Sequence, residues 1–172
     1  PGSFNYKGKG TAMKINLTSY IPHIFGTVTL SNGESLTGEF FVDTGAKANV
    51  DFNTPFVEAN QMEKKIGDSY VYLVAGLGKK EFEHHRGTVK SFSFVGFSFQ
   101  NVPVGLSHAK SGIQNHKKVS GILGSGVLSK FNIVYDYKSK TMYWEANKNY
   151  ETPFKVNASG IELQLSTDKS KV

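Results

Sequence analysis

The chain has 172 residues, a formal net charge of +6, 38% hydrophobic residues and no cysteine. This length fits one domain with a sizeable core, and a charged fraction of 20% is too low for a disordered polyelectrolyte. The lack of cysteine excludes thiol catalysis, disulfides and cysteine-based zinc sites, and no apolar run reaches the roughly 18 residues of a membrane-spanning helix. The lysines are scattered, without the basic stripe and interleaved aromatics that indicate a nucleic-acid partner.

The first quarter of the chain alternates apolar and polar residues, which predicts β-strands. After a glycine-rich segment at 1–10 that is typical of a linker, we expect strands over residues 13–17, 23–30 and 36–42. The pair Asn32-Gly33 between the second and third of these is a strong hairpin-turn signal.

The middle of the chain favours further strands, interrupted once by a helix. Thr54 as N-cap and Pro55 at the first helical position predict a short helix over 54–60. Segments rich in Val, Phe and Tyr and separated by glycines predict strands over 71–75, 81–89, 91–94 and 97–104.

The last third of the chain contains a polar segment, an apolar strand, a helix and a hairpin. Residues 107–119 are typical of a surface loop, and Gly121-Ile122-Leu123-Gly124 of an apolar strand end. Residues 125–131 can form about two helical turns, and 132–137 with 141–144 predict a hairpin. The composition and these elements together predict an all-β fold with two short helices.

Asp43 is the residue best placed for hydrolytic chemistry. A hydrolase that activates water needs a carboxylate that is held rigidly, hydrogen-bonded and partly desolvated. Asp43 follows the apolar run Phe40-Phe41-Val42, and Thr44-Gly45 behind it can form a tight turn that aims backbone N–H groups at the carboxylate. The alternative is that Asp-Thr-Gly is an ordinary turn, because such a tripeptide also occurs by chance.

Two motifs together resemble one lobe of the pepsin-like and retroviral aspartic peptidases. FFVDTGA and, after a β-rich stretch, GILGSGVLSKFNIVYDYKSKTMYW occur in the order and context of that family. The resemblance covers nearly the whole chain and is greatest to bacterial aspartyl peptidases with two lobes and a PDZ domain. The segments FNYKGKG and PFKVNASGIEL match the connections on either side of the second lobe. The resemblance therefore implies a linker at 1–10, a lobe at 11–150 and the start of a linker or PDZ-like domain at 151–172.

The resemblance implies a closed β-barrel of the acid protease fold and an aspartic endopeptidase activity without a cofactor. Asp43 corresponds to the catalytic aspartate, Thr44 to the residue whose hydroxyl joins the two active-site loops, and Gly45 to the residue that admits close backbone approach. Ala46 replaces a hydroxyl donor that pepsin-like lobes have, so we expect activity nearer to neutral pH than in pepsin. The family also closes its cleft with a hairpin flap, whose tip corresponds to Gly76, Leu77 and Gly78.

One lobe supplies one aspartate, whereas the mechanism needs two carboxylates that share a proton. The expected partners are a peptide or protein substrate and a second aspartic lobe, either in the same protein or in a second copy as a homodimer. The family resemblance also suggests the bacterial periplasm, the cell envelope or secretion.

One alternative function competes with this interpretation, and two other groups of residues could be taken for functional sites. The chain could be a non-catalytic β-barrel module of the same fold that binds peptides or serves as a scaffold. A metal site is not expected, because the adjacent His84 and His85 point to opposite faces of a strand and no His-Glu-x-x-His helix exists. Asp136 lies before a lysine-rich turn, where an aspartate most often caps the turn.

Overall fold

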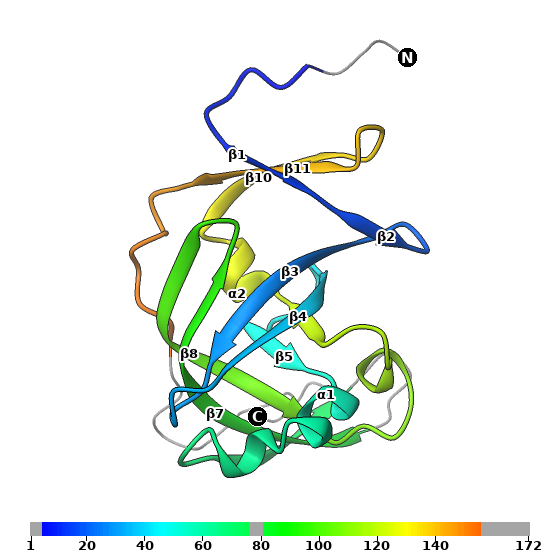
Figure 1. Cartoon of the computed structure of the whole chain (residues 1–172), viewed down its shortest axis with the longest axis vertical. Coiled ribbons are helices and arrows are strands. Elements are labelled where there is room, and N and C mark those ends of the chain that lie inside the picture. The colour runs from blue at the N-terminus through cyan, green and yellow to red at the C-terminus, as the bar shows by residue number, and fades with distance from the viewer. Residues whose placement is uncertain (1–4, 76–80, 156–172) are drawn as a thin grey trace, which may run out of the picture.

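The computed structural model describes residues 5–75 and 81–155, and most of their regular structure is β-strand (Figure 1). The predicted all-β fold with two short helices is confirmed. The strands are β1 (Thr11–Lys14), β2 (Asn16–Thr18), β3 (Ile21–Thr29), β4 (Ser35–Val42), β5 (Val50–Phe52), β6 (Tyr70–Ala75), β7 (Glu81–Phe94), β8 (Phe97–Ser107), β9 (Gly121–Leu123), β10 (Phe131–Asp136) and β11 (Thr141–Ala146). The α-helices are α1 (Thr54–Ala59) and α2 (Ser125–Leu128), and two 3-10 turns are η1 (Met62–Lys64) and η2 (Ile113–Asn115).

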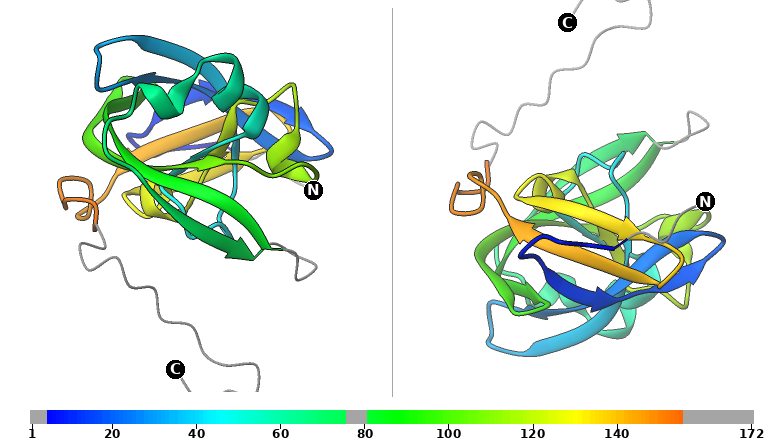
Figure 2. Two further views of the ribbon diagram at one scale, coloured as in Figure 1. Left: turned by 90° about the horizontal axis from the view of Figure 1, so that it is seen from below. Right: turned by 90° about the horizontal axis from the view of Figure 1, so that it is seen from above.

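The strands form two sheets. The small sheet has the order β1-β11-β10, and the large one β2-β3-β4-β9-β5-β8-β7-β6, with an additional pairing between β3 and β7. The small sheet crosses one end of the molecule and the large sheet curves below it (Figures 1 and 2). Most neighbouring strands are antiparallel, but β4 pairs with β9, and β5 with β8, in parallel.

The hairpin between β3 and β4 forms at the predicted turn. Gly33 has φ +88°, a conformation that favours glycine, and Asn32 Oδ1 accepts a hydrogen bond from Glu34 N at 3.0 Å. The turn holds β3 and β4 in register from Thr29↔Ser35 to His23↔Phe41. The hydrophobic run at the end of β4 is thereby directed into the core.

The core of the large sheet is aromatic. The ring of Phe40 lies edge-on to those of Phe52 (5.7 Å between centroids) and Phe92 (5.2 Å), and all three side chains are fully buried. A second group of rings around Phe131 and Trp144 fills the space beneath the small sheet. The carboxyl end of β4 is therefore anchored in the best-packed part of the molecule.

The predicted and observed elements differ at several places, and the helix expected over 125–131 ends at Leu128, before β10 begins at Phe131. The strand expected over residues 13–17 is divided between β1 and β2, which belong to different sheets, because the buried Ile15 lies where the chain crosses between them. The short strand β5 was not predicted. The two strands expected between Glu81 and Phe94 are one strand, β7, which pairs with β6, β8 and β3 along its length.

The helix expected over 54–60 is confirmed, but its N-cap is Asn53 and not Thr54. The side chain of Asn53 is fully buried and makes no capping bond; instead Nδ2 lies within 3.3 Å of the carbonyl oxygens of Ile113, His116 and Val119. Thr54 Oγ1 donates to the carbonyl of Ala109 at 2.9 Å. The loop before β9 is therefore held in place by two polar side chains at the start of α1.

The ends of the described chain also contact the fold. Tyr6, in the expected linker, stacks on Tyr143 with ring centroids 4.1 Å apart, and Tyr150 packs against Phe131. Phe154 lies against Phe99 at 5.6 Å. The predicted segment beyond residue 155 lies outside the described residues.

We predict that Asn53→Ala lowers the free energy of unfolding by about 2–3 kcal/mol, because several loop carbonyls lose their donor in a buried site. Urea denaturation measures the change. The matched control is Asn60→Ala, whose side chain donates only to the Phe56 carbonyl at the end of α1. Equal losses for the two variants would contradict the role assigned to Asn53.

Candidate active site

Asp43 lies directly after β4, at the end of the buried run Phe40-Phe41-Val42. Its backbone N–H donates to Leu123 O at 3.0 Å, and its Oδ1 accepts a hydrogen bond from the backbone N–H of Gly45 at 2.8 Å. The expected tight turn that aims an N–H at the carboxylate is therefore present. The expected desolvation is not met in this chain, because Asp43, Thr44 and Gly45 are all exposed.

The loop that follows Asp43 is fixed by the junction of β9 and α2. Strand β9 lies between β4, to which it is parallel, and β5, to which it is antiparallel. From its end, Gly124 N donates to Asn49 O (3.0 Å) and Gly126 N to Ala48 O (2.9 Å). These donors include N–H groups at the start of α2, which have no partner within the helix. The N–H groups at the start of the helix and the carbonyl groups of the loop thus satisfy each other's need for a hydrogen-bond partner.

Ser125 ties the two segments together twice. Its backbone N–H and its hydroxyl Oγ both donate to the carbonyl oxygen of Ala46, each at 2.8 Å. The sequence alone indicated no role for this serine. The signal that could have found it is its position, immediately after the apolar strand and at the start of a helix that faces the loop.

The backbone of the loop after Asp43 lies so close to Gly124 that only a glycine fits at this position. A Cβ atom at this position would lie 2.4 Å from Ala48 O and 2.9 Å from Ala46 O, both of which are backbone atoms. Gly45 is less constrained, because its nearest neighbour would be Asp43 Oδ1 at 3.3 Å. The close approach that the resemblance placed at Gly45 is therefore tighter at Gly124.

An apolar cluster lies beside the loop. Phe41, Val119 and Ile122 are buried together, and Ala46 packs against them. The hydroxyl of Thr44 has no hydrogen-bond partner within residues 5–75 and 81–155. The exposed end of the loop therefore carries the Asp43 carboxylate and the Thr44 hydroxyl, next to this buried apolar cluster.

Strands β6 and β7 form an antiparallel hairpin from Tyr70↔Arg86 to Ala75↔Glu81. The predicted flap tip, Gly76, Leu77 and Gly78, belongs to residues 76–80 and lies outside the described residues. The arms of the hairpin are present where the flap is expected, and the tip stays a prediction.

A second carboxylate, Asp51, lies in a polar cluster that the sequence did not indicate. Burial raises the pKa of Asp51, against the opposing charges of His84 and Arg86. Burial likewise lowers the pKa of His84, against the attraction of Asp51. The Arg86 guanidinium lies 4.3 Å from the centre of the Tyr72 ring, and Tyr72 OH is 3.3 Å from His84 Nδ1. Because Asp51 lies on β5 and His84 and Arg86 lie on β7, the cluster brings together side chains from different strands of the large sheet.

A cavity of about 630 Å³ lies beside this cluster, and its lining includes Asp51, Arg86 and Lys130. Lys47, Ala48 and Asn49 of the loop contribute to its wall, but Asp43 does not. The exposed carboxylate of Asp43 and this cavity are therefore separate features of the loop.

Asp136 has the structural role that was predicted for it. Its Oδ1 and Oδ2 accept hydrogen bonds from Ser139 N (3.1 Å) and Ser139 Oγ (2.7 Å), and these bonds lower the pKa of the Asp136 carboxyl. It caps the turn between β10 and β11.

Comparison with protein-family models and with curated proteins finds no match for this chain. Among residues 5–75 and 81–155, no helix combines the length and the apolar character needed to cross a membrane.

We predict that Ser125→Ala lowers the free energy of unfolding by about 1 kcal/mol, because it removes one half-buried hydrogen bond and leaves the backbone bond to Ala46. Thermal and urea unfolding measure this loss. Ser129→Ala is the control, since the exposed Ser129 hydroxyl lies 3.5 Å from its acceptor, Gly126 O. A loss at Ser125 no larger than that at Ser129 would show that the hydroxyl does not support the loop.

Proposed function

We propose that the chain is one lobe of an aspartic endopeptidase of the pepsin-like and retroviral class, in which Asp43 supplies one of two catalytic carboxylates. The observation that carries this proposal is the geometry of Asp43. A carboxylate held by a backbone N–H at the end of a buried strand is exposed on a loop that a second strand and a helix keep rigid.

The arrangement of β4, β9 and β5 supports the proposal. The FFVDTGA and GILG motifs, about eighty residues apart in the sequence, are paired side by side as Phe41↔Ile122 and Val42↔Leu123. A pairing of this kind explains why both motifs occur together in an aspartic lobe. The additional β3–β7 pairing, which joins two strands distant in the sheet order, supports the closed barrel of the acid protease fold.

The exposure of Asp43 and Thr44 supports a site that is shared between two lobes. Two carboxylates about 3 Å apart cannot both ionise, so one keeps a proton and the other is a base. In the proposed mechanism, the ionised carboxylate takes a proton from water, which attacks the scissile peptide carbonyl. The protonated carboxyl assists by hydrogen-bonding the carbonyl oxygen, and no covalent intermediate forms. The unpaired Thr44 hydroxyl is available to a matching loop of the second lobe.

The alternative is a non-catalytic module in which Asp43 only stabilises its turn through Gly45. This alternative predicts that the carboxylate can be neutralised without loss of function. It shares the fold and the loop geometry with the first proposal, so the two are distinguished by activity.

We predict that Asp43→Asn abolishes peptide hydrolysis, because the amide cannot accept a proton from water. Cleavage of casein and of a peptide library by the protein that contains this chain measures the loss, with Asp136→Asn as a control for an aspartate that caps a turn. Circular dichroism verifies that both variants fold. Equal turnover by Asp43→Asn and the unchanged protein would overturn the catalytic proposal.

We predict that Ala46→Ser shifts the acid limb of the pH–rate profile to lower pH. A hydroxyl at this position would donate to the ionised carboxylate and favour the charged form. Ala48→Ser, two residues further along the same loop, is the control. A pH optimum of the unchanged protein below about 4 would contradict the expected effect of Ala46.

A further inference from the structure

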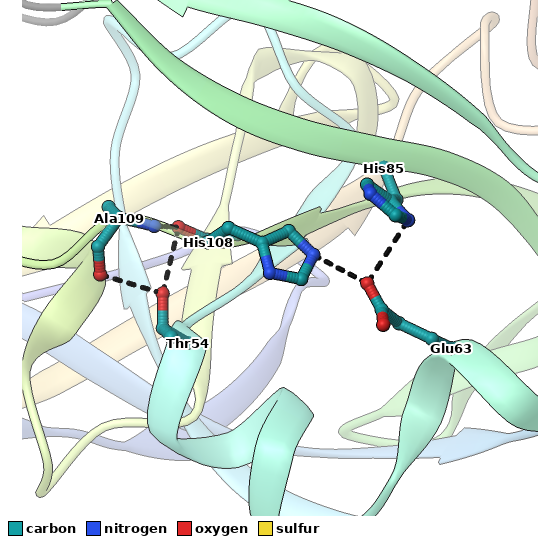
Figure 3. A network of polar contacts seen from close by, with 6 residues as sticks. Thr54, Glu63, His85, His108 and Ala109 are labelled. Atoms are coloured by element: carbon teal, nitrogen blue, oxygen red, sulfur yellow. Dashed lines mark hydrogen bonds and ion pairs between the residues drawn. The ribbon is translucent and has the colours of Figure 1, made fainter.

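Glu63, His85 and His108 come together from three separate elements (Figure 3). Glu63 belongs to η1, His85 to β7, and His108 follows the end of β8. Glu63 Oε1 is 3.0 Å from His85 Nδ1 and 2.5 Å from His108 Nε2. One ligand atom from each of the three residues lies within 4.8 Å of the others.

We propose that these three side chains bind a divalent transition-metal ion of the zinc class. Two imidazole nitrogens and one carboxylate oxygen are a donor set that such ions prefer, whereas Mg²⁺ and Ca²⁺ prefer oxygen ligands. Three protein ligands leave a fourth tetrahedral position for a water molecule.

The polar contacts of the cluster favour a metal over a simple hydrogen-bonded network. Glu63 Oε1 and His108 Nε2 are both shielded from solvent, yet within the described parts of the chain neither atom has a partner in hydrogen-bond geometry. Their side chains are 38% and 30% exposed, and that of His85 is 26% exposed, so an ion has access from solvent. The ligand atoms of the three side chains therefore lie close together near the surface, an arrangement in which they can coordinate one cation.

The two separations that involve Glu63 Oε1 fit a metal site after small movements, and the three ligand atoms lie within 4.8 Å of one another. Bonds of about 2.0–2.1 Å in a tetrahedron put ligand atoms about 3.3 Å apart. The separations of 3.0 and 2.5 Å from Glu63 Oε1 need to increase by less than 1 Å. Rotations of a partly exposed glutamate side chain can supply such a movement.

Within residues 5–75 and 81–155, the other histidines do not form a comparable site. His84 is buried and faces Gln114 and Tyr72, and His23 is buried 3.5 Å from Glu39. His116 contacts the ring of Phe41. The sequence argument that His84 and His85 cannot share an ion therefore holds, but His85 finds its partners in two other elements.

An ion at this point would act as a clamp. It would join η1, which follows α1, to the antiparallel β7 and β8 strands through His85 and His108. Because the ion binds the folded chain, its free energy of binding would add to the stability of the fold. This inference does not depend on the proposed peptidase activity.

The test is isothermal titration of the metal-free protein with ZnCl₂, and with MgCl₂ as a second probe, combined with thermal unfolding. We expect one equivalent of Zn²⁺ to bind and to raise the melting temperature, and Mg²⁺ to do neither. His85→Gln, His108→Gln and the near-isosteric Glu63→Gln should each weaken Zn²⁺ binding by more than about tenfold, since even outer-shell partners of a metal contribute that much.

His116→Gln is the matched control, because it removes a histidine outside the cluster and should leave Zn²⁺ binding unchanged. Circular dichroism of each metal-free variant verifies its fold, and Glu63→Gln retains the volume of the side chain if a histidine variant does not fold. Absence of Zn²⁺ binding, or binding that the three cluster variants leave unchanged, would overturn the proposal and leave an ion-paired network only. Equal weakening by His116→Gln would also overturn it.

Discussion

The exchange of backbone hydrogen bonds between the loop after β4 and the β9–α2 junction is the constraint on which the site depends. Gly124, Ser125 and Gly126 donate to carbonyls of residues 49, 46 and 48, in that order. The start of a helix needs acceptors, and a loop needs donors, so each segment satisfies what the other lacks. The loop is therefore hydrogen-bonded to a segment that is anchored in the core through Leu123 and Val127, both fully buried.

In the proposed peptidase, this constraint would hold Asp43 where a second lobe can reach it. A carboxylate that is exposed in one lobe would become desolvated when a second lobe covers it, and a second carboxylate, which carries a like charge, favours a proton shared between the two. The buried apolar cluster of Phe41, Val119 and Ile122 lies beside the loop on the side of this chain. The carboxyl of Asp51, in contrast, is buried within the chain, and the nearby charges of His84 and Arg86 oppose the rise in its pKa that burial causes.

Local patterns in the sequence predict the hairpins, the helix after β5 and the Asp-Thr-Gly turn, because these depend on neighbours along the chain. Three features depend on distant residues and are not predicted. Strand β5 is short and is defined by its pairing with β8 and β9. The sequence predicted Thr54 as the N-cap of α1, whereas the N-cap is Asn53, whose side chain holds a loop some sixty residues away. His85 is excluded as a ligand when only its neighbour His84 is considered, whereas its partners Glu63 and His108 come from other elements.

The most direct test of the central claim is an experimental structure of the protein in its assembled form, with attention to what faces Asp43. We predict that a second carboxylate, from another lobe or a second copy of the chain, lies about 3 Å from the Asp43 carboxylate, with the Thr44 hydroxyl bonded across the contact. An assembled structure in which Asp43 stays exposed to solvent, with no carboxylate in hydrogen-bond reach, would contradict it.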